Sequence, residues 1–361
     1  MKNVVVSYDE SKWYAVPANN GGNGSIWQWG DEILIGYTGG EAKFNKKGHQ
    51  VDGESQYISK LARSKDGGKT WENFVPSGYQ KYSGIRKDPV DLSEGIDFSE
   101  PGFLMRVEGN GYHGNYGHQW FYSQDKGENW HGPYTFGNLL EHPQLEGREF
   151  TGRTSYIVNG AKECLLFLSV RGSGNGLEVS TTDKVFLAET KDGGKTFNFV
   201  NWIVSPSDPH RAVMPASVRI DENKLVASIR RKDKNGYGWI DCCHSINNGQ
   251  DWSFLSRVGE TGVHNGNPPA MIKMNDGRLC CVFGNRNRRV ILAKYSSDEG
   301  RTWSSEQIIR DNHKSINGYP DLGYPRLFQR QDGKLVTTYF WCSPERPQTH
   351  IEATIFSTEK E

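Results

Sequence analysis

The sequence lacks several features that would place it in a common functional class. Its 43 basic and 43 acidic residues cancel, whereas a nucleic-acid-binding surface needs a basic excess, so we expect no nucleic-acid partner. No apolar run is long enough to cross a membrane. The N-terminal stretch 1–14 also lacks a signal-peptide core and cleavage site. We therefore expect no membrane segment, in a protein that is either cytoplasmic or exported with its leader removed.

Metal and cofactor motifs are missing as well. There are six cysteines, but none has the Cys-x-x-Cys or Cys/His spacing of a zinc site. Two pairs are adjacent in sequence, Cys242–Cys243 and Cys280–Cys281, and adjacent residues of a strand point to opposite faces. Buried free thiols are therefore expected. No glycine-rich phosphate loop is present either, so we predict no cofactor and no metal.

Aromatic residues and glycine are abundant instead. The chain holds 11 Trp, 16 Tyr and 42 Gly. Aromatic side chains suit β-sheet packing and sugar-stacking surfaces, and glycine suits tight turns. The composition favours an all-β protein with many hairpins.

One eight-residue pattern recurs along the chain. It reads Ser/Thr-x-Asp/Asn-x-Gly-x-x-Trp/Phe, and its copies begin at Ser64, Ser123, Thr190, Ser245 and Ser296. The Asp or Asn side chain can cap the backbone of a hairpin turn, and the glycine accepts a positive φ. Short β-rich runs surround each copy. The recurrence of the pattern along the chain indicates a series of similar structural units, each containing one copy.

This pattern resembles the Asp-box, or BNR, repeat of the sialidase-like superfamily. The resemblance covers nearly the whole chain and implies a six-bladed β-propeller, formed as one domain by residues 1–361. The five boxes mark five blades, and the runs from 323 onward form a sixth without a box. We expect the N-terminal run 4–14 to supply its missing strand and so to close the ring.

In a propeller, the loops at one end of the blades surround a central funnel. The boxes join the third strand to the fourth and lie at the other end, which makes them structural. The funnel end receives the long loop 39–56, with His49 and Asp52. Long polar loops at such a position favour a functional site.

Basic residues also recur at this end. They end the second strands of successive blades or open an inner strand, and several arginines together would bind a carboxylate. The arginines are Arg153, Arg171, Arg230, Arg231 and Arg286.

Two further loops reach the funnel. The loop before the sixth blade carries Asp321, Tyr324 and Arg326, and the loop before the fifth carries His264. A tyrosine or histidine there also has a structural alternative, as a buried or hydrogen-bonded loop residue.

The resemblance assigns roles to some of these residues. Sialidases use a tyrosine nucleophile assisted by a glutamate, an aspartate acid/base and three arginines on the substrate carboxylate. Tyr324 matches the nucleophile, and Asp52 is the nearest match to the aspartate, with His49 as its rival. Arg230 matches the second arginine, and Arg286 or Arg288 the third.

Two positions depart from the family pattern. The first arginine is replaced in Ser25-Ile26-Trp27, and the glutamate is replaced by Met214. Arg153 is our candidate for the lost arginine, and Glu149 or Glu41 for the lost glutamate. These departures favour a substrate other than sialic acid itself.

We therefore expect an exo-acting glycoside hydrolase. Its partner would be an oligosaccharide or glycoconjugate that ends in an acidic sugar. Asp52 or His49 would protonate the leaving oxygen, and Tyr324 would act as nucleophile or stabilise the oxocarbenium ion. A polysaccharide lyase acting on uronates and a non-catalytic carbohydrate-binding propeller are the alternatives.

Overall fold

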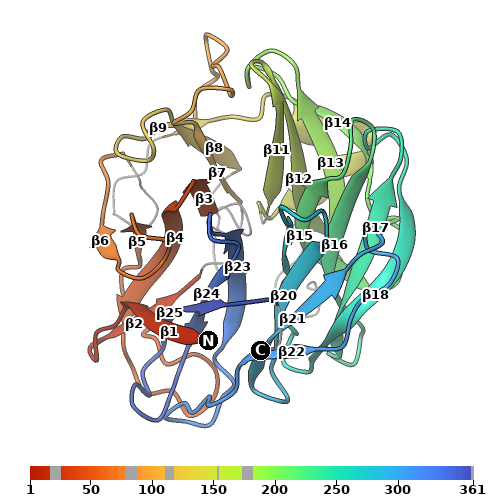
Figure 1. The fold of residues 1–361 in the computed structure, drawn as a ribbon. Coiled ribbons are helices and arrows are strands. Elements are labelled where there is room, and N and C mark those ends of the chain that lie inside the picture. Colours follow the sequence, from red (N-terminus) through yellow and green to blue (C-terminus); the bar gives the residue numbers. More distant parts are fainter. Residues whose placement is uncertain (17–25, 79–87, 110–117, 153, 173–181, 359–361) are drawn as a thin grey trace.

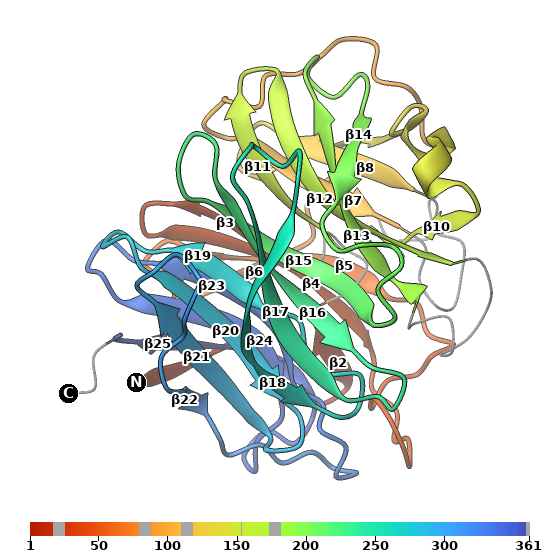
Figure 2. The same ribbon diagram turned by 90° about the vertical axis from the view of Figure 1, so that its right-hand side faces the viewer.

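The computed structural model describes residues 1–16, 26–78, 88–109, 118–152, 154–172 and 182–358. In this part of the chain, regular structure is almost entirely antiparallel β (Figure 1). Two 3-10 turns, η2 (Leu139–Glu141) and η3 (Pro143–Leu145), are its only helical elements. Six sheets stand around a common axis as the blades of a propeller, which confirms the expected fold (Figures 1 and 2).

The first five blades are each a sheet of strands that are consecutive in the sequence. Blade one contains β2 (Lys12–Ala15), β3 (Ile26–Trp29), β4 (Glu32–Glu41), β5 (Ile58–Ser64) and β6 (Glu72–Phe74). Blade two contains β7 (Leu104–Glu108), β8 (Gln119–Ser123) and β9 (His131–Tyr134). Blade three contains β10 (Arg148–Phe150), β11 (Ser155–Gly160), β12 (Glu163–Gly172), β13 (Lys184–Thr190) and β14 (Asn198–Trp202).

The remaining three blades are regular four-stranded sheets. Blade four contains β15 (Arg211–Arg219), β16 (Leu225–Lys232), β17 (Gly238–Ser245) and β18 (Ser253–Gly262). Blade five contains β19 (Ala270–Lys273), β20 (Leu279–Asn285), β21 (Val290–Ser296) and β22 (Gln307–Arg310). Blade six contains β23 (Gly323–Gln329), β24 (Leu335–Trp341), β25 (His350–Phe356) and, as its outer strand, β1 (Lys2–Ser7).

The N-terminal run closes the ring, but only with its first half. β1 pairs antiparallel with β25, with Val4 opposite Ala353. The chain then turns at Asp9, whose side chain accepts a hydrogen bond from the backbone of Ser11 at 2.8 Å. The second half of the run forms β2, which pairs with β4 in blade one. The local turn at Asp9 is the physical reason that 4–14 divides between two blades.

Six hydrophobic clusters lie between neighbouring blades, one for each of the six contacts around the ring. The cluster between blades one and six joins Ile35 of β4 to Ile351 of β25. Each blade thus buries both of its faces against neighbours, as the aromatic and β-branched runs in the sequence require. All six cysteines are buried and free, as expected.

The repeated turns show how the five copies of the pattern hold their hairpins. In the first, Ser64 Oγ accepts a hydrogen bond from the Gly68 N–H at 2.8 Å, and Asp66 accepts bonds from the backbone and hydroxyl of Thr70. The Trp71 indole donates to the Gly68 carbonyl. The turn joins β5 to β6, so it lies at the end of the blade opposite the loop that joins β4 to β5. The turns are therefore part of the scaffold.

Candidate active site

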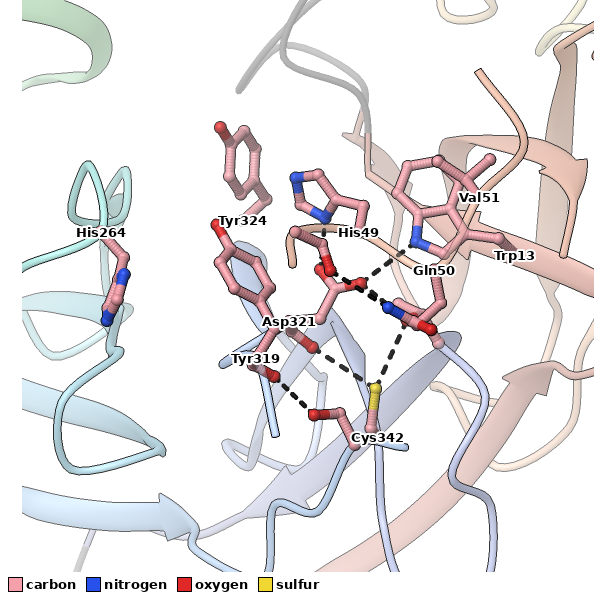
Figure 3. A network of polar contacts seen from close by, with 12 residues as sticks. Trp13, His49, Gln50, Val51, His264, Tyr319, Asp321, Tyr324 and Cys342 are labelled. Atoms are coloured by element: carbon pink, nitrogen blue, oxygen red, sulfur yellow. Dashed lines mark hydrogen bonds and ion pairs between the residues drawn. The ribbon is translucent and has the colours of Figure 1, made fainter. Parts of the chain in front are cut away.

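At the funnel end, the long loop of blade one meets the segment that leads into blade six. His49 Nδ1 lies 2.6 Å from Oδ1 of Asp321. The other oxygen of Asp321 accepts hydrogen bonds from Thr349 Oγ1 at 2.8 Å and from the Trp13 indole at 3.2 Å. The Asp321 side chain is fully buried, whereas the His49 side chain is 43% exposed. The buried carboxylate thus fixes the imidazole ring and leaves its other nitrogen, Nε2, available to a ligand (Figure 3).

This pairing shifts the proton affinities of both groups. Burial alone would lower the pKa of His49, but the charge of Asp321 and the hydrogen bond to it outweigh burial, and the pKa of His49 is raised. Burial alone would raise the pKa of Asp321, but His49, Thr349 and Trp13 together lower it from 3.8 to about 2. Asp321 therefore stays ionised at neutral pH and favours the protonated form of His49.

A tyrosine with an arginine on its phenol oxygen lies next to this pair. The Tyr324 ring stands beside His49 (Figure 3), and the charge of Tyr324 contributes to the upward shift in the pKa of His49. Arg230 Nη1 donates to the phenol oxygen at 3.1 Å, and the guanidinium lies over the ring. Arg230 is itself buried, and its Nε donates to the Asn265 carbonyl at 3.0 Å. A fixed cation on the phenol oxygen stabilises the phenolate.

Strained backbone is concentrated around these groups. Among the described residues, eight non-glycine residues adopt a positive φ. Three of them, Lys126, Asn248 and Glu299, lie in the repeated turns. The other five lie at the funnel end: Met214, His264, Asn265, Arg289 and Tyr324. Such conformations cost free energy and often gather where a fold holds side chains for function, so their distribution supports this end as the candidate site.

Gly323 shows how tightly the tyrosine is placed. It has a φ of +119°, and a Cβ at this position would lie 1.8 Å from Oδ1 of Asn267. The same Asn267 oxygen accepts the Tyr324 backbone N–H at 3.2 Å. Only glycine fits this close approach, which sets the direction of the tyrosine that follows.

The loop that carries His49 is held by hydrogen bonds to blade six. Asn317 Nδ2 donates to the carbonyls of Asn45 and Gly48 at 2.9 and 3.0 Å. Within the loop, Asn45 Nδ2 donates to the His49 carbonyl at 2.7 Å, and the Gln50 amide donates back to the Asn45 carbonyl at 2.8 Å. His49 therefore stands on an anchored loop.

The other predicted residues fall into distinct places. Arg286 is buried and donates to the His264 carbonyl. The His264 ring lies 5.9 Å from that of Tyr319, which in turn lies 5.6 Å from that of His49. His264 thus lies near His49, Asp321 and Tyr324 (Figure 3). Arg286 joins this group through its bond to the His264 carbonyl, and Arg230 joins it through its bond to Tyr324.

Three other predicted residues are not part of this cluster, and a fourth is not among the residues that the structure describes. Asp52 lies on the same loop as His49, but its carboxylate pairs with Lys43 at 3.2 Å. Arg171 pairs with Glu149 at 2.7 Å in blade three. Arg326 is buried and lines the central channel with Trp27 and Tyr156 of the inner strands.

Arg153 lies outside the described residues. Of the two candidates for the missing glutamate, Glu149 is the partner of Arg171, and Glu41 pairs with Lys12.

Sequence reasoning missed the residues that support the site from behind. Trp13 and Thr349 hold Asp321, and Asn267 holds Tyr324. Tyr319, which lies between the two histidines, was also missed. Tyr319 precedes Asp321 by two positions, and that proximity was a usable signal. Trp13 gave none, because its role depends on a strand pairing between distant segments.

No set of three or more His, Cys, Asp and Glu side chains that could hold a metal ion occurs among the described residues. In the same part of the chain, no helix has the length and apolar character needed to cross a membrane.

Comparison with known proteins agrees with this architecture. The family model of the BNR repeat-like domain matches residues 103–337. No curated protein matches the chain. A solved structure of a protein of unknown function from Dyadobacter fermentans aligns with a TM-score of 0.69 at 18% identity, covering 99% of this chain and 98% of that one.

Two solved enzymes also share the fold. A Hadza microbial sialidase aligns with a TM-score of 0.58 at 16% identity, covering 96% of this chain and 66% of that one. An alpha-L-arabinanase from Penicillium chrysogenum, complexed with arabinobiose, aligns with a TM-score of 0.57 at 14% identity. The alignment covers 99% of this chain and 98% of that one. The six-bladed propeller fold is thus shared with solved glycoside hydrolases.

Proposed function

The chain belongs to the BNR repeat-like domain family, and on this premise we propose that it is a glycoside hydrolase that releases a terminal acidic sugar from an oligosaccharide or glycoconjugate. The observation that carries the proposal is the meeting of two pairs at the funnel end. His49 is oriented by buried Asp321, and Tyr324 is held under Arg230. Together they offer an acid and a nucleophile at one place, on a scaffold shared with glycoside hydrolases.

In the proposed reaction, the bond between the anomeric carbon and the leaving oxygen breaks as His49 Nε2 gives its proton to that oxygen. The Tyr324 phenolate, stabilised by Arg230, forms a bond to the anomeric carbon. A water molecule then gives a proton to His49 and its oxygen to the anomeric carbon, and the phenolate leaves. Asp321 stabilises the imidazolium throughout and does not touch the substrate.

We assign the acid role to His49 in preference to Asp52. His49 has a raised pKa and a free ring nitrogen beside Tyr324. The pKa of Asp52 is lowered by hydrogen bonds from the Glu54 backbone and from Lys43, which makes it a weaker proton donor at neutral pH. Arg286 supports an acidic substrate, and Arg153 remains our candidate for a further arginine.

One observation favours elimination from a uronate as the second candidate. Among the described residues, the carboxylate in contact with the His49 ring is that of Asp321, and it is buried. Glycoside hydrolysis usually employs two carboxylates, whereas elimination needs a base, an acid and a cation. His49 would take the C5 proton and Tyr324 would protonate the leaving oxygen as the C4–O4 bond breaks and a C4–C5 double bond forms.

The test is to incubate the protein with acidic and neutral oligosaccharides and to identify products by mass spectrometry and ultraviolet absorbance. Hydrolysis adds water to the products, whereas elimination produces an absorbing unsaturated sugar. We expect hydrolysis, with rate losses of about 100-fold or more for His49→Ala and less than about tenfold for Asp52→Asn. Binding without any product would mean that the propeller is a carbohydrate-binding module.

A further inference from the structure

A hollow lined by cations opens beside the candidate active site. It has a volume of about 670 Å³. The lining comes from the tip of the His49 loop, from the loop between β18 and β19, from the loop after β20, and from the segment that precedes Asp321. The charged residues in the lining are Lys46, Lys47, Arg286 and Arg289, and no acidic residue is among them.

Three other arginines at the funnel end pair with carboxylates: Arg171 with Glu149, Arg211 with Asp183 and Arg231 with Asp208. Within the described part of the chain, no ion pair forms between a carboxylate and any of the four cations of the hollow. A group of like charges without counter-charges costs stability, so its presence indicates a ligand that supplies them.

The hollow is built to keep these cations in place. Arg286 is 4% exposed and donates to the His264 carbonyl. Arg289 adopts a positive φ and donates to the Gly318 carbonyl at 2.7 Å. Lys46 and Lys47 are exposed on the loop that Asn317 anchors. Two fixed arginines and two lysines thus face one space.

The hollow shares part of its lining with the candidate active site, because His264 and Arg286 contribute to both. Tyr319 lines it, and the same ring lies 5.6 Å from that of His49. Gly48, the residue before His49, also lines it, whereas Tyr324 is not in its lining. A substrate whose leaving oxygen meets His49 and whose anomeric carbon meets Tyr324 would therefore extend its leaving group across Tyr319 into the hollow.

From this arrangement we infer that the hollow is a subsite for the leaving group, and that it binds an anionic group on the sugar next to the cleaved bond. The preferred substrate is then a polyanionic glycan, with negative charge on both sides of that bond. The charge can be a uronate carboxylate or a sulfate ester, since both present oxygens that arginine and lysine bind. The inference rests on the proposed function, because it uses His49 and Tyr324 to orient the substrate.

The test is calorimetric binding at two salt concentrations, on a Tyr324→Phe background that prevents turnover. The probes are an oligogalacturonate, a sulfated chondroitin tetrasaccharide and a neutral cello-oligosaccharide of similar length. We expect an anionic probe to bind more tightly and its affinity to fall with salt. The Lys46→Ala/Lys47→Ala variant should weaken it about tenfold and leave the neutral probe unaffected; comparison of the uronate with the sulfated probe identifies the anion.

The matched control is Lys65→Ala/Lys69→Ala, which removes the same charge from the first repeated turn, at the far end of its blade. Equal binding of charged and neutral probes, or equal effects of the two double variants, would overturn the subsite. Cleavage is tested in a separate experiment, by product analysis with the protein that retains Tyr324. Anion binding through Lys46 and Lys47 without any cleavage would instead refute the proposed reaction.

Discussion

His49 and Asp321 illustrate how function at the residue scale depends on side chains that never meet the substrate. The exposed ring of His49 contacts Asp321, which is buried and accepts from three donors. The orientation and the pKa of the His49 ring are therefore determined by a buried residue that does not contact the substrate. This makes Asp321 a positioning residue, and the pH dependence of the reaction should report on it.

We predict that activity falls as pH rises through the raised pKa of His49, because the acid must be protonated. Asp321→Asn removes the charge that raises this pKa, so the alkaline limb of the rate profile should move to lower pH and kcat should fall by about 100-fold or more. Steady-state kinetics across pH measures both effects. Thr349→Val removes one donor but keeps the carboxylate, and should retain the alkaline limb. An unchanged limb in Asp321→Asn would contradict the role of Asp321.

The same carboxylate should affect stability in acid. Its pKa is lowered from 3.8 to about 2, so its contribution is present above pH 3.8 and is lost as pH falls towards 2. The wild-type protein should therefore lose stability over this range more steeply than Asp321→Asn. Urea unfolding at several pH values measures the difference, and parallel curves for the two proteins would refute it.

The repeated turns show a second effect at the residue scale, in which two positions complement each other. In four turns an Asp accepts a hydrogen bond from the side chain four residues later, as in Asp66 with Thr70 and Asp125 with Asn129. The fourth turn reverses the roles, because Asn247 Nδ2 donates to Asp251 at 2.9 Å. Each pair thus has one donor and one acceptor.

Asn247→Asp should therefore destabilise the protein, because it places two carboxylates in contact. We expect a loss of about 1 kcal/mol in the free energy of unfolding. Adding Asp251→Thr restores the arrangement of the other turns and should recover most of the loss. Urea unfolding measures both, and catalysis should not change because the turn lies at the opposite end of the blade. A neutral single variant would show that the pairing has no energetic role.

At the scale of elements, the loop that joins β4 to β5 depends on its anchor to blade six. Asn317 supplies two hydrogen bonds to loop carbonyls. Asn317→Ala should free the loop and displace His49, lowering kcat/KM about tenfold with only a small change in melting temperature. Asn317→Asp cannot donate these bonds and should behave similarly. Wild-type kinetics in both variants would show that the loop holds its shape unaided.

The strands of most blades could be predicted because their signals are local. The runs that became β24 and β25 are β-rich and bounded by turn residues, and the repeated pattern marks five hairpins. The division of residues 4–14 between β1 and β2 was not predictable in this way. It depends on pairing with β25 and β4, which are distant in sequence, and on a single aspartate turn that resembles many surface turns.

The candidate site was predictable to a similar degree. His49, Tyr324, Arg230, Arg286 and His264 could be placed at one end of the propeller because strand order alone assigns loops to ends. The partnership of His49 with Asp321 was not foreseen, since it joins residues from opposite ends of the chain through side-chain geometry. The pairing of Asp52 with Lys43 could not be predicted from spacing either. Both Asp52 and His49 lie on the same loop, so the sequence could not show which of them serves as the acid.

At the scale of the whole molecule, the ring is closed by strand pairing between the two ends of the described chain. β1 covers the outer edge of β25, and Val6 is buried in the cluster between blades one and six. Unpaired strand edges promote association between molecules. Closure of the ring therefore prevents association through the edge of β25 as well as stabilising the fold.

Deletion of residues 2–7 should lower the free energy of unfolding by about 3 kcal/mol or more, through lost apolar burial and strand pairing. It should also produce dimers or larger species through the exposed edge of β25. Chemical denaturation and light scattering after size exclusion measure these effects. Lys2→Ala, which keeps the strand, serves as the control, and a synthetic peptide of residues 1–8 should reverse the association. A stable, monomeric deletion variant would contradict the role of β1.

The pairing of β1 with β25 also has a consequence for biosynthesis. The ribosome makes β1 before its partner β25, so β1 must wait, unpaired, while five blades emerge and fold. A contact between such distant segments forms slowly, and until then the waiting segment remains open to chaperones and proteases. Newly made chains should therefore be most vulnerable at this segment during translation, and should lose that vulnerability once β25 has emerged and paired with it.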